Sequence, residues 1–203
     1  MDIEFNGIRF HGYLISAVFI LIFLTIQILR RKRWPHIFCL ALFSIYVLIA
    51  LNETFFPLAI NGAYVENMRT VPMRSFINLI PFYLGTFHVI DGRDLLDFAN
   101  NILLTIPFGF GVIFVSRLRP RDFVWLPLAV GFGIETAQLL ISLILGYPYR
   151  VVDINDALLN TVGVLIGYGL FRIFAWLFIH LTRRFKDKSA GWLAYIGEVV
   201  TRA

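Results

Sequence analysis

Five long apolar stretches are the feature of this sequence that most restricts how the chain can fold. They cover residues 13–29, 36–58, 98–116, 123–145 and 157–181, and each has 17 to 25 residues. An α-helix of about 20 residues crosses the hydrocarbon core of a bilayer and satisfies all its backbone hydrogen bonds internally. Hydrophobic residues make up 59 % of the chain and charged residues 15 %, against roughly 45–50 % and about 25 % in soluble domains. We therefore predict an all-α polytopic membrane protein with five transmembrane helices.

The positive charges predict the orientation of these helices. Twelve of the 18 Lys and Arg residues follow the first, third and fifth stretches, which would place them on one side of the membrane, and five lie on the other side. The twelve are Arg30, Arg31, Lys32, Arg33, Arg117, Arg119, Arg121, Arg183, Arg184, Lys186, Lys188 and Arg202. The positive-inside rule places the richer side in the cytoplasm, with the N-terminus outside and the C-terminus inside. The net charge of +5 is then explained by orientation, and no nucleic-acid partner is expected.

Polar residues recur at helical spacing in three of the stretches and at their edges. One stripe contains Gly131, Glu135, Gln138 and Ser142, a second contains Asp153, Asp156, Asn160, Gly163 and Gly167, and a third contains Asp94, Asp97, Asn101 and Thr105. Their spacings of three and four residues put each set on one helix face. With the predicted orientation, all three sets lie in the outer half of the membrane. Ionisable groups at this depth are costly unless they face protein or water, so they often mark a functional site.

These stripes, with polar residues from the outer loops, predict a polar pocket open to the outside. The candidate residues are Arg74, Asn78, Asp97, Asn101, Glu135, Gln138, Arg150, Asp153, Asp156 and Asn160. Gly131, Gly163 and Gly167 are expected to pack helices closely, and the last two form a GxxxG motif. A structural alternative stays open, because small polar stripes also pack membrane helices. Asp153 and Asp156 would equally suit the N-terminus of a helix, where the helix dipole favours carboxylates.

Two segments outside the five stretches carry apolar residues of their own. The outer loop 61–98 contains the stretch 76–87, interrupted by Pro81, which either dips into the membrane or lies on it. The tail 189–203 places Trp192, Ile196, Val199 and Val200 at helical spacing, which predicts a short interfacial helix.

Motifs for common catalytic chemistry are missing from the sequence. It contains no phosphate-binding GxxxxGK[ST] motif, no GxSxG nucleophile elbow and no HExxH zinc motif. Two DxxD pairs, Asp94/Asp97 and Asp153/Asp156, have the oxygen ligands that suit Mg²⁺, but the same spacing is common where helices begin. No catalytic residue is assigned, and neither a metal nor another cofactor is expected.

Four segments resemble, in this order, the VanZ-like family of bacterial membrane proteins. They are RSFINLIPF (74–82), DFANNILLTIPFGFGV (97–112), IETAQ (134–138) and RVVDINDALLNTVGVLIG (150–167). The resemblance covers about residues 70–170. The family pattern falls on Asn78, Pro81, Phe82, Asp97, Asn101, Pro107, Gly109, Glu135, Gln138, Asp153, Asp156, Asn160, Gly163 and Gly167. The founding member gives resistance to the glycopeptide teicoplanin, so the resemblance implies a role in the cell envelope but supplies no reaction.

The resemblance and the stripes together divide the chain and suggest what it does. Residues 1–69 would hold two helices and the start of the outer loop, 70–170 the VanZ-like core, and 171–203 the end of the last helix and a cytoplasmic interfacial tail. We expect a multi-pass protein of the bacterial cytoplasmic membrane that lowers susceptibility to teicoplanin-type antibiotics without degrading them. The alternative is a membrane-embedded enzyme or transporter for a lipid-linked cell-wall precursor. The expected partners are membrane lipids and such a precursor or a lipoglycopeptide.

Overall fold

The computed structural model describes residues 9–10, 12–30, 32–83, 91–182 and 191–202. Within these ranges the chain forms seven α-helices. They are α1 (Tyr13–Leu29), α2 (Trp34–Phe55), α3 (Ala63–Arg69), α4 (Gly92–Val115), α5 (Leu126–Leu145), α6 (Ile154–Thr182) and α7 (Gly191–Arg202). Two 3₁₀ helices, η1 (Met73–Phe76) and η2 (Pro120–Val124), lie in the connections.

The long helices have the length and hydropathy of membrane-crossing helices. Among the described helices, α2, α4, α5 and α6 are both long enough and apolar enough to cross a membrane. Only 17–28 % of the apolar 18-residue segment of each of these helices is buried inside the protein. Their remaining apolar surface suits a lipid environment, so the predicted all-α polytopic membrane protein is confirmed. The first predicted stretch is α1, which has 17 residues. The number of five spans and their orientation stay predictions.

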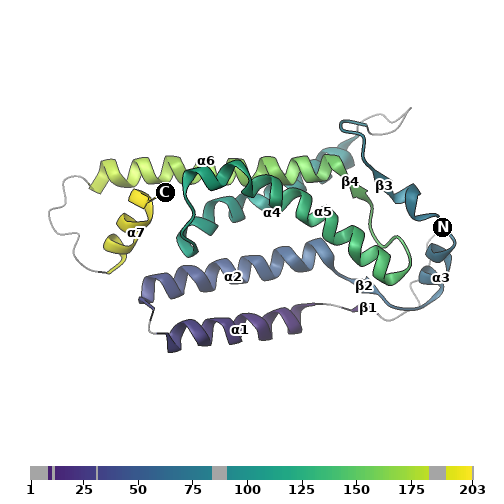
Figure 1. The fold of residues 1–203 in the computed structure, drawn as a ribbon, viewed down its shortest axis with the longest axis horizontal. Coiled ribbons are helices and arrows are strands. Elements are labelled where there is room, and N and C mark those ends of the chain that lie inside the picture. Colours follow the sequence, from purple (N-terminus) through teal and green to yellow (C-terminus); the bar gives the residue numbers. More distant parts are fainter. Residues whose placement is uncertain (1–8, 11, 31, 84–90, 183–190, 203) are drawn as a thin grey trace.

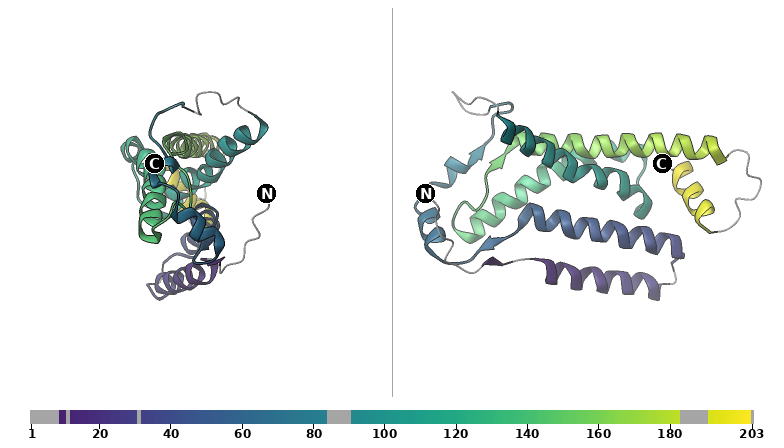
Figure 2. Two further views of the ribbon diagram at one scale, coloured as in Figure 1. Left: turned by 90° about the vertical axis from the view of Figure 1, so that its right-hand side faces the viewer. Right: turned by 180° about the vertical axis from the view of Figure 1, so that it is seen from behind.

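The helices pack as a bundle with α1 at one edge. Figures 1 and 2 show α1 beside α2, which separates it from the other long helices. The most extensive contact joins α4 to α6, and α5 also packs on α6. Two glycines allow this close approach. A Cβ on Gly163 would lie 2.1 Å from Thr105 Oγ1, and a Cβ on Gly131 would lie 2.2 Å from the carbonyl oxygen of Ala157.

Short strands connect the loops at the end of the bundle where α2 ends and α4 and α6 begin (Figure 1). β1 (Arg9–Phe10) pairs antiparallel with β2 (Leu58–Ala59), and β3 (Ile77–Asn78) pairs parallel with β4 (Val152–Asp153). Part of the outer apolar stretch 76–87 is therefore tied to the segment before α6. Residues 84–87 of that stretch lie outside the described residues.

Capping residues set the boundaries of two of the long helices. α4 begins at Gly92, six residues before the predicted start at 98, because Asp91 forms a capping box. Its carboxylate accepts hydrogen bonds from the backbone N–H groups of Arg93 and Asp94, at 2.7 and 3.1 Å. α5 ends at Leu145 and is capped by Gly146, whose φ of 73° is a conformation that glycine adopts without strain. The polar first turns of α4 are therefore helical and not part of a loop.

The C-terminal segment forms α7, which lies at the other end of the bundle from α3 (Figure 1). The predicted helix 189–203 corresponds to α7, whose buried residues are Tyr195, Val199 and Val200. The Tyr195 hydroxyl donates a hydrogen bond to the carbonyl of Phe114 at the end of α4. Burial raises the pKa of this phenol, which keeps it a donor. The apolar face that suggested a membrane surface thus packs largely against the bundle.

Candidate functional site

An acidic cavity of about 750 Å³ opens at the end of the bundle where α2 ends and α4 and α6 begin. Four carboxylates, one guanidinium and four side-chain amides line it. They are Glu53, Asp97, Glu135, Asp156, Arg150, Asn100, Asn101, Gln138 and Asn160. Seven of the ten residues predicted for a polar pocket are in this lining. The cavity is therefore made by α2, α4, α5, α6 and the loop after α5 together.

Glu135 and Gln138 bring the polar face of α5 into the cavity. Both side chains are 7 % exposed. Glu135 Oε2 accepts a hydrogen bond of 3.0 Å from the backbone N–H of Asp153, just before α6. Gln138 Nε2 donates a 3.2 Å hydrogen bond to the carbonyl of Thr54 near the end of α2. Glu135 and Gln138 thus join one face of α5 to the segment before α6 and to the end of α2.

The facing sides of α4 and α6 supply a second polar pair. Asn101 Nδ2 donates a 2.7 Å hydrogen bond to Asp156 Oδ1. One turn deeper, the Thr105 hydroxyl donates to the backbone carbonyl of Asn160 at 2.8 Å. The Asn160 side chain lines the cavity and is 1 % exposed, and its Oδ1 has no hydrogen-bond partner among the described residues. Because a buried acceptor without a partner is costly, Asn160 is a candidate contact for a ligand or water.

Arg150 holds the loop after α5 against the end of α2. Its Nη2 donates to the backbone carbonyls of Glu53 at 2.9 Å and Phe56 at 3.2 Å. Glu135 is held by the backbone amide of Asp153 and makes no hydrogen bond with Arg150 among the described residues. Burial raises the pKa of the adjacent Tyr149 phenol to about 12, so this group stays protonated beside the carboxylates. The Arg150 guanidinium is the one positively charged group in the described lining, which contains four carboxylates.

Asp153 has the capping position that the sequence offered as an alternative to a ligand role. Its Oδ1 accepts from the backbone N–H of Asn155 at 2.8 Å, in the first turn of α6, and from Asn78 Nδ2 at 3.0 Å. Asn155 in turn accepts a 2.6 Å hydrogen bond from the backbone N–H of Phe82. These contacts tie the outer loop to the start of α6 and border the cavity. Arg74 is exposed in η1 and does not belong to the lining of this cavity.

Several residues of the site were not predicted from the sequence. Glu53, Thr54 and Asn100 line the cavity, and Asn155 fixes the outer loop. Asn100 lies three residues after Asp97 on the same helix face, which was a usable signal. Glu53 was visible as a charge in the second stretch, but no spacing linked it to the other stripes.

The arrangement suits a ligand that presents several hydrogen-bond donors. Ionised carboxylates only accept hydrogen bonds, whereas side-chain amides both donate and accept. Hydroxyl groups of a sugar and ammonium groups fit such a lining. Among the described residues, no group of three or more His, Cys, Asp or Glu side chains is placed to hold a metal ion.

The Asn101–Asp156 pair gives a prediction on stability. Replacing Asn101 by Ala should lower the free energy of unfolding by about 1 to 2 kcal/mol, because the half-buried Asp156 carboxylate loses a charge-assisted donor. Thermal unfolding of the purified protein in detergent measures the change. Asn100→Ala is the matched control, since exposed Asn100 lines the same cavity on the same helix. Equal melting temperatures for the two variants would show that the pair contributes no stability.

Comparison with known proteins places this bundle in a family. A family model described as VanZ/LLP1 matches residues 43–175, which includes most of α2 and all of α4 and α5. The chain is also 27 % identical over 163 residues to an alpha-(1->3)-arabinofuranosyltransferase of Corynebacterium glutamicum. That match covers 74 % of this chain but only 38 % of the relative, so the chain spans well under half of that protein. No solved structure matches this chain. The resemblance found in the sequence is confirmed, and the chain belongs to the VanZ/LLP1 family.

Proposed function

We propose that the acidic cavity is an outward-facing ligand site and that the protein lowers susceptibility to teicoplanin-type glycopeptides without modifying them. The observation that carries this proposal is the unpartnered Oδ1 of Asn160, 1 % exposed in a cavity lined by four carboxylates. In this cavity a ligand can supply the hydrogen-bond donor that the buried acceptor needs. Family membership supports a protein of the cell envelope, and the teicoplanin phenotype is the one that the family's founding member suggests.

The position of the cavity supports an external role. It lies at the opposite end of the bundle from Arg30, Arg33 and Arg117. The excess of Lys and Arg at that other end favours its placement in the cytoplasm, in a bacterial cytoplasmic membrane. The acidic cavity would then face the side where cell-wall precursors are exposed and where a lipid-tailed antibiotic inserts.

Expression in a susceptible Gram-positive host tests the proposal. The inhibitory concentration of teicoplanin should rise severalfold, and that of vancomycin, which lacks the acyl tail, should rise less. Detection of the protein in the membrane fraction is the necessary control. If the protein is in the membrane and neither concentration changes, the resistance function is wrong.

A second candidate is an enzyme or transporter that acts on a lipid-linked cell-wall precursor. The 27 % match to a protein named as an arabinofuranosyltransferase favours it, since a lining of carboxylates and amides also suits sugar hydroxyls. Turnover or transbilayer movement of a lipid-linked sugar by the purified protein in vesicles would support this candidate. In that case Asp156 and Glu135 are the first residues to replace, because both line the cavity.

A further inference from the structure

A second cavity, of about 550 Å³, lies at the opposite end of the bundle from the acidic one. The turn between α1 and α2, the end of α4 and one face of α7 enclose it. Its lining includes five cationic side chains and one carboxylate. They are Arg30, Lys32, Arg33, Arg117, Arg202 and Glu198. The acidic cavity and this basic cavity therefore carry opposite charge, and the basic one has no part in the site described above.

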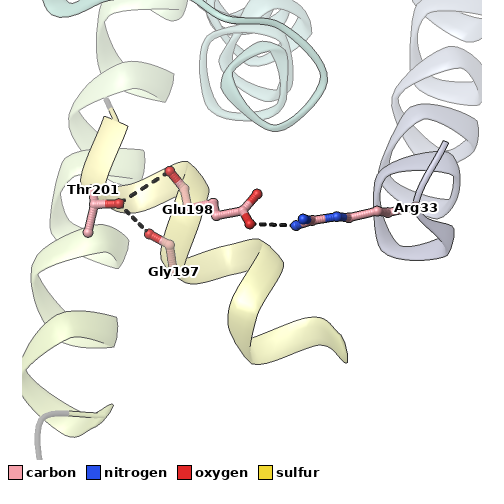
Figure 3. A network of polar contacts seen from close by, with 4 residues as sticks. All are labelled: Arg33, Gly197, Glu198 and Thr201. Carbon is pink, nitrogen blue, oxygen red and sulfur yellow. Dashed lines mark hydrogen bonds and ion pairs between the residues drawn. The ribbon is translucent and has the colours of Figure 1, made fainter. Parts of the chain in front are cut away.

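Two of the five cationic side chains contact other groups of the protein. Arg33 forms an ion pair with Glu198 of α7, at 2.5 Å (Figure 3). Arg202 donates to the backbone carbonyls of Ile113 at 3.2 Å and Ser116 at 2.7 Å, at the end of α4. These contacts fix α7 against α2 and α4 and complete the walls of the cavity.

Three cations of the lining are left for a ligand. In the part of the chain that the structure describes, Arg30, Lys32 and Arg117 form no ion pair. All three are exposed. They come from the turn after α1 and from the segment after α4, so they approach the cavity from different elements. Such an arrangement favours an anion that accepts hydrogen bonds from several directions, as a phosphate does.

The uncharged part of the lining holds polar groups, Gln27, His36, Ser116 and Tyr195, and an apolar wall. The apolar wall includes Phe23 of α1, Leu40 of α2 and Phe114 of α4. Two exposed tryptophans, Trp34 and Trp192, with 68 % and 42 % exposure, lie at the same end of the bundle. Tryptophan is enriched where a membrane protein meets the headgroup region. The cavity thus combines cations at headgroup level with an apolar wall beneath them.

We propose that this basic cavity binds the phosphate of an anionic phospholipid, with Arg30, Lys32 and Arg117 contacting the phosphate and the apolar wall contacting the acyl chains. The chemistry that the cations recognise is a phosphate group, which a free anion would share. The apolar wall favours the lipid, because a soluble phosphate would gain nothing from Phe23 and Leu40. This inference does not depend on the proposed function of the acidic cavity.

Lipid-dependent thermal stability of the purified full-length protein in detergent tests the proposal. Short-chain phosphatidylglycerol should raise the melting temperature in a saturable way, whereas phosphatidylcholine of the same chain length and inorganic phosphate should not. One basic residue near an anionic membrane surface stabilises binding by an amount that corresponds to about a fivefold change in affinity. Arg117→Gln and, independently, Lys32→Gln should each weaken the phosphatidylglycerol effect by about that factor.

Arg119→Gln is the matched control, because Arg119 is an exposed arginine two residues from Arg117 and outside the cavity lining. It removes the same charge and should leave the lipid effect unchanged. If Arg119→Gln weakens binding as much as Arg117→Gln and Lys32→Gln do, the lipid responds to overall charge and the site is refuted. Equal stabilisation by inorganic phosphate would refute the lipid as the ligand. Melting temperatures without lipid show that the variants are folded, and having two independent variants keeps the test decisive if one of them is not.

Discussion

Replacing Gly167 by Ala should lower the free energy of unfolding of the purified protein by about 2 kcal/mol or more, the upper part of the range for overpacked sites. A Cβ at this position would lie 2.1 Å from the carbonyl oxygen of Ile106 and 2.8 Å from the backbone nitrogen of Phe110 on α4. Backbone atoms cannot move aside as a flexible side chain can, so α4 and α6 would have to separate. Thermal or denaturant unfolding in detergent measures the loss.

Gly169→Ala provides the control for this prediction. Gly169 lies on the same helix, two residues further on, and a Cβ there would meet no atom of a neighbouring element within 4 Å. Ala is the better helix former by about 1 kcal/mol, so this variant should be unchanged or slightly more stable. Similar stability of the Gly167 and Gly169 variants would mean that α4 and α6 do not pack as closely as described.

Replacing Glu135 by Gln should return the inhibitory concentration of teicoplanin to that of a host without the protein. The change keeps the shape of the side chain and removes the negative charge from a cavity lining where Glu135 is 7 % exposed. Hydrogen bonds to charged groups are worth about 1.5–3 kcal/mol, which corresponds to a loss of about 10- to 100-fold in ligand affinity. Broth dilution with equal amounts of protein in the membrane measures the effect.

Thr136→Val is the matched control for Glu135→Gln. Thr136 is the next residue of α5, is exposed, and its hydroxyl donates only to the carbonyl of Phe132 within the same helix, among the described residues. It should leave protection unchanged. Full protection by the Glu135→Gln protein would show that the negative charge of this carboxylate is not required.

The sequence predicted the long helices well because their signal is strong and local. Residues 13–29 coincide with α1, and α5 and α6 differ from the predicted stretches by at most three residues at each end. α4 was predicted to begin too late, because hydropathy does not detect polar first turns that Asp91 caps. The helix boundary there depends on a capping box, and hydropathy alone could not place it.

The convergence of the polar stripes followed from periodicity, whereas the individual contacts did not. Spacing of three and four residues places Glu135 and Gln138 on one face, and these two and Asn160 line one cavity. The pairing of Arg150 with the carbonyls of Glu53 and Phe56 depends on how two loops meet. Such contacts join residues that are about a hundred positions apart, and a single sequence contains no local signal for them.

The apolar face of α7 shows a further limit of sequence patterns. An amphipathic helix beside a membrane can cover its apolar face with lipid or with protein, and both give the same periodicity. Here Val199 is 2 % exposed and packs in the core together with Phe171 and Ile113. The pattern therefore predicted the helix correctly and left its partner undetermined.

The side of the membrane that the acidic cavity faces is measured most directly by cysteine accessibility in intact cells. After Cys39 is replaced by Ala, cysteines introduced separately at Asn100, in the cavity lining, and at Thr201, exposed on α7, are treated with an impermeant thiol reagent. We expect the cysteine at position 100 to react in intact cells and the one at position 201 to react only after permeabilisation. The reverse pattern would place the acidic cavity in the cytoplasm and contradict an outward-facing ligand site.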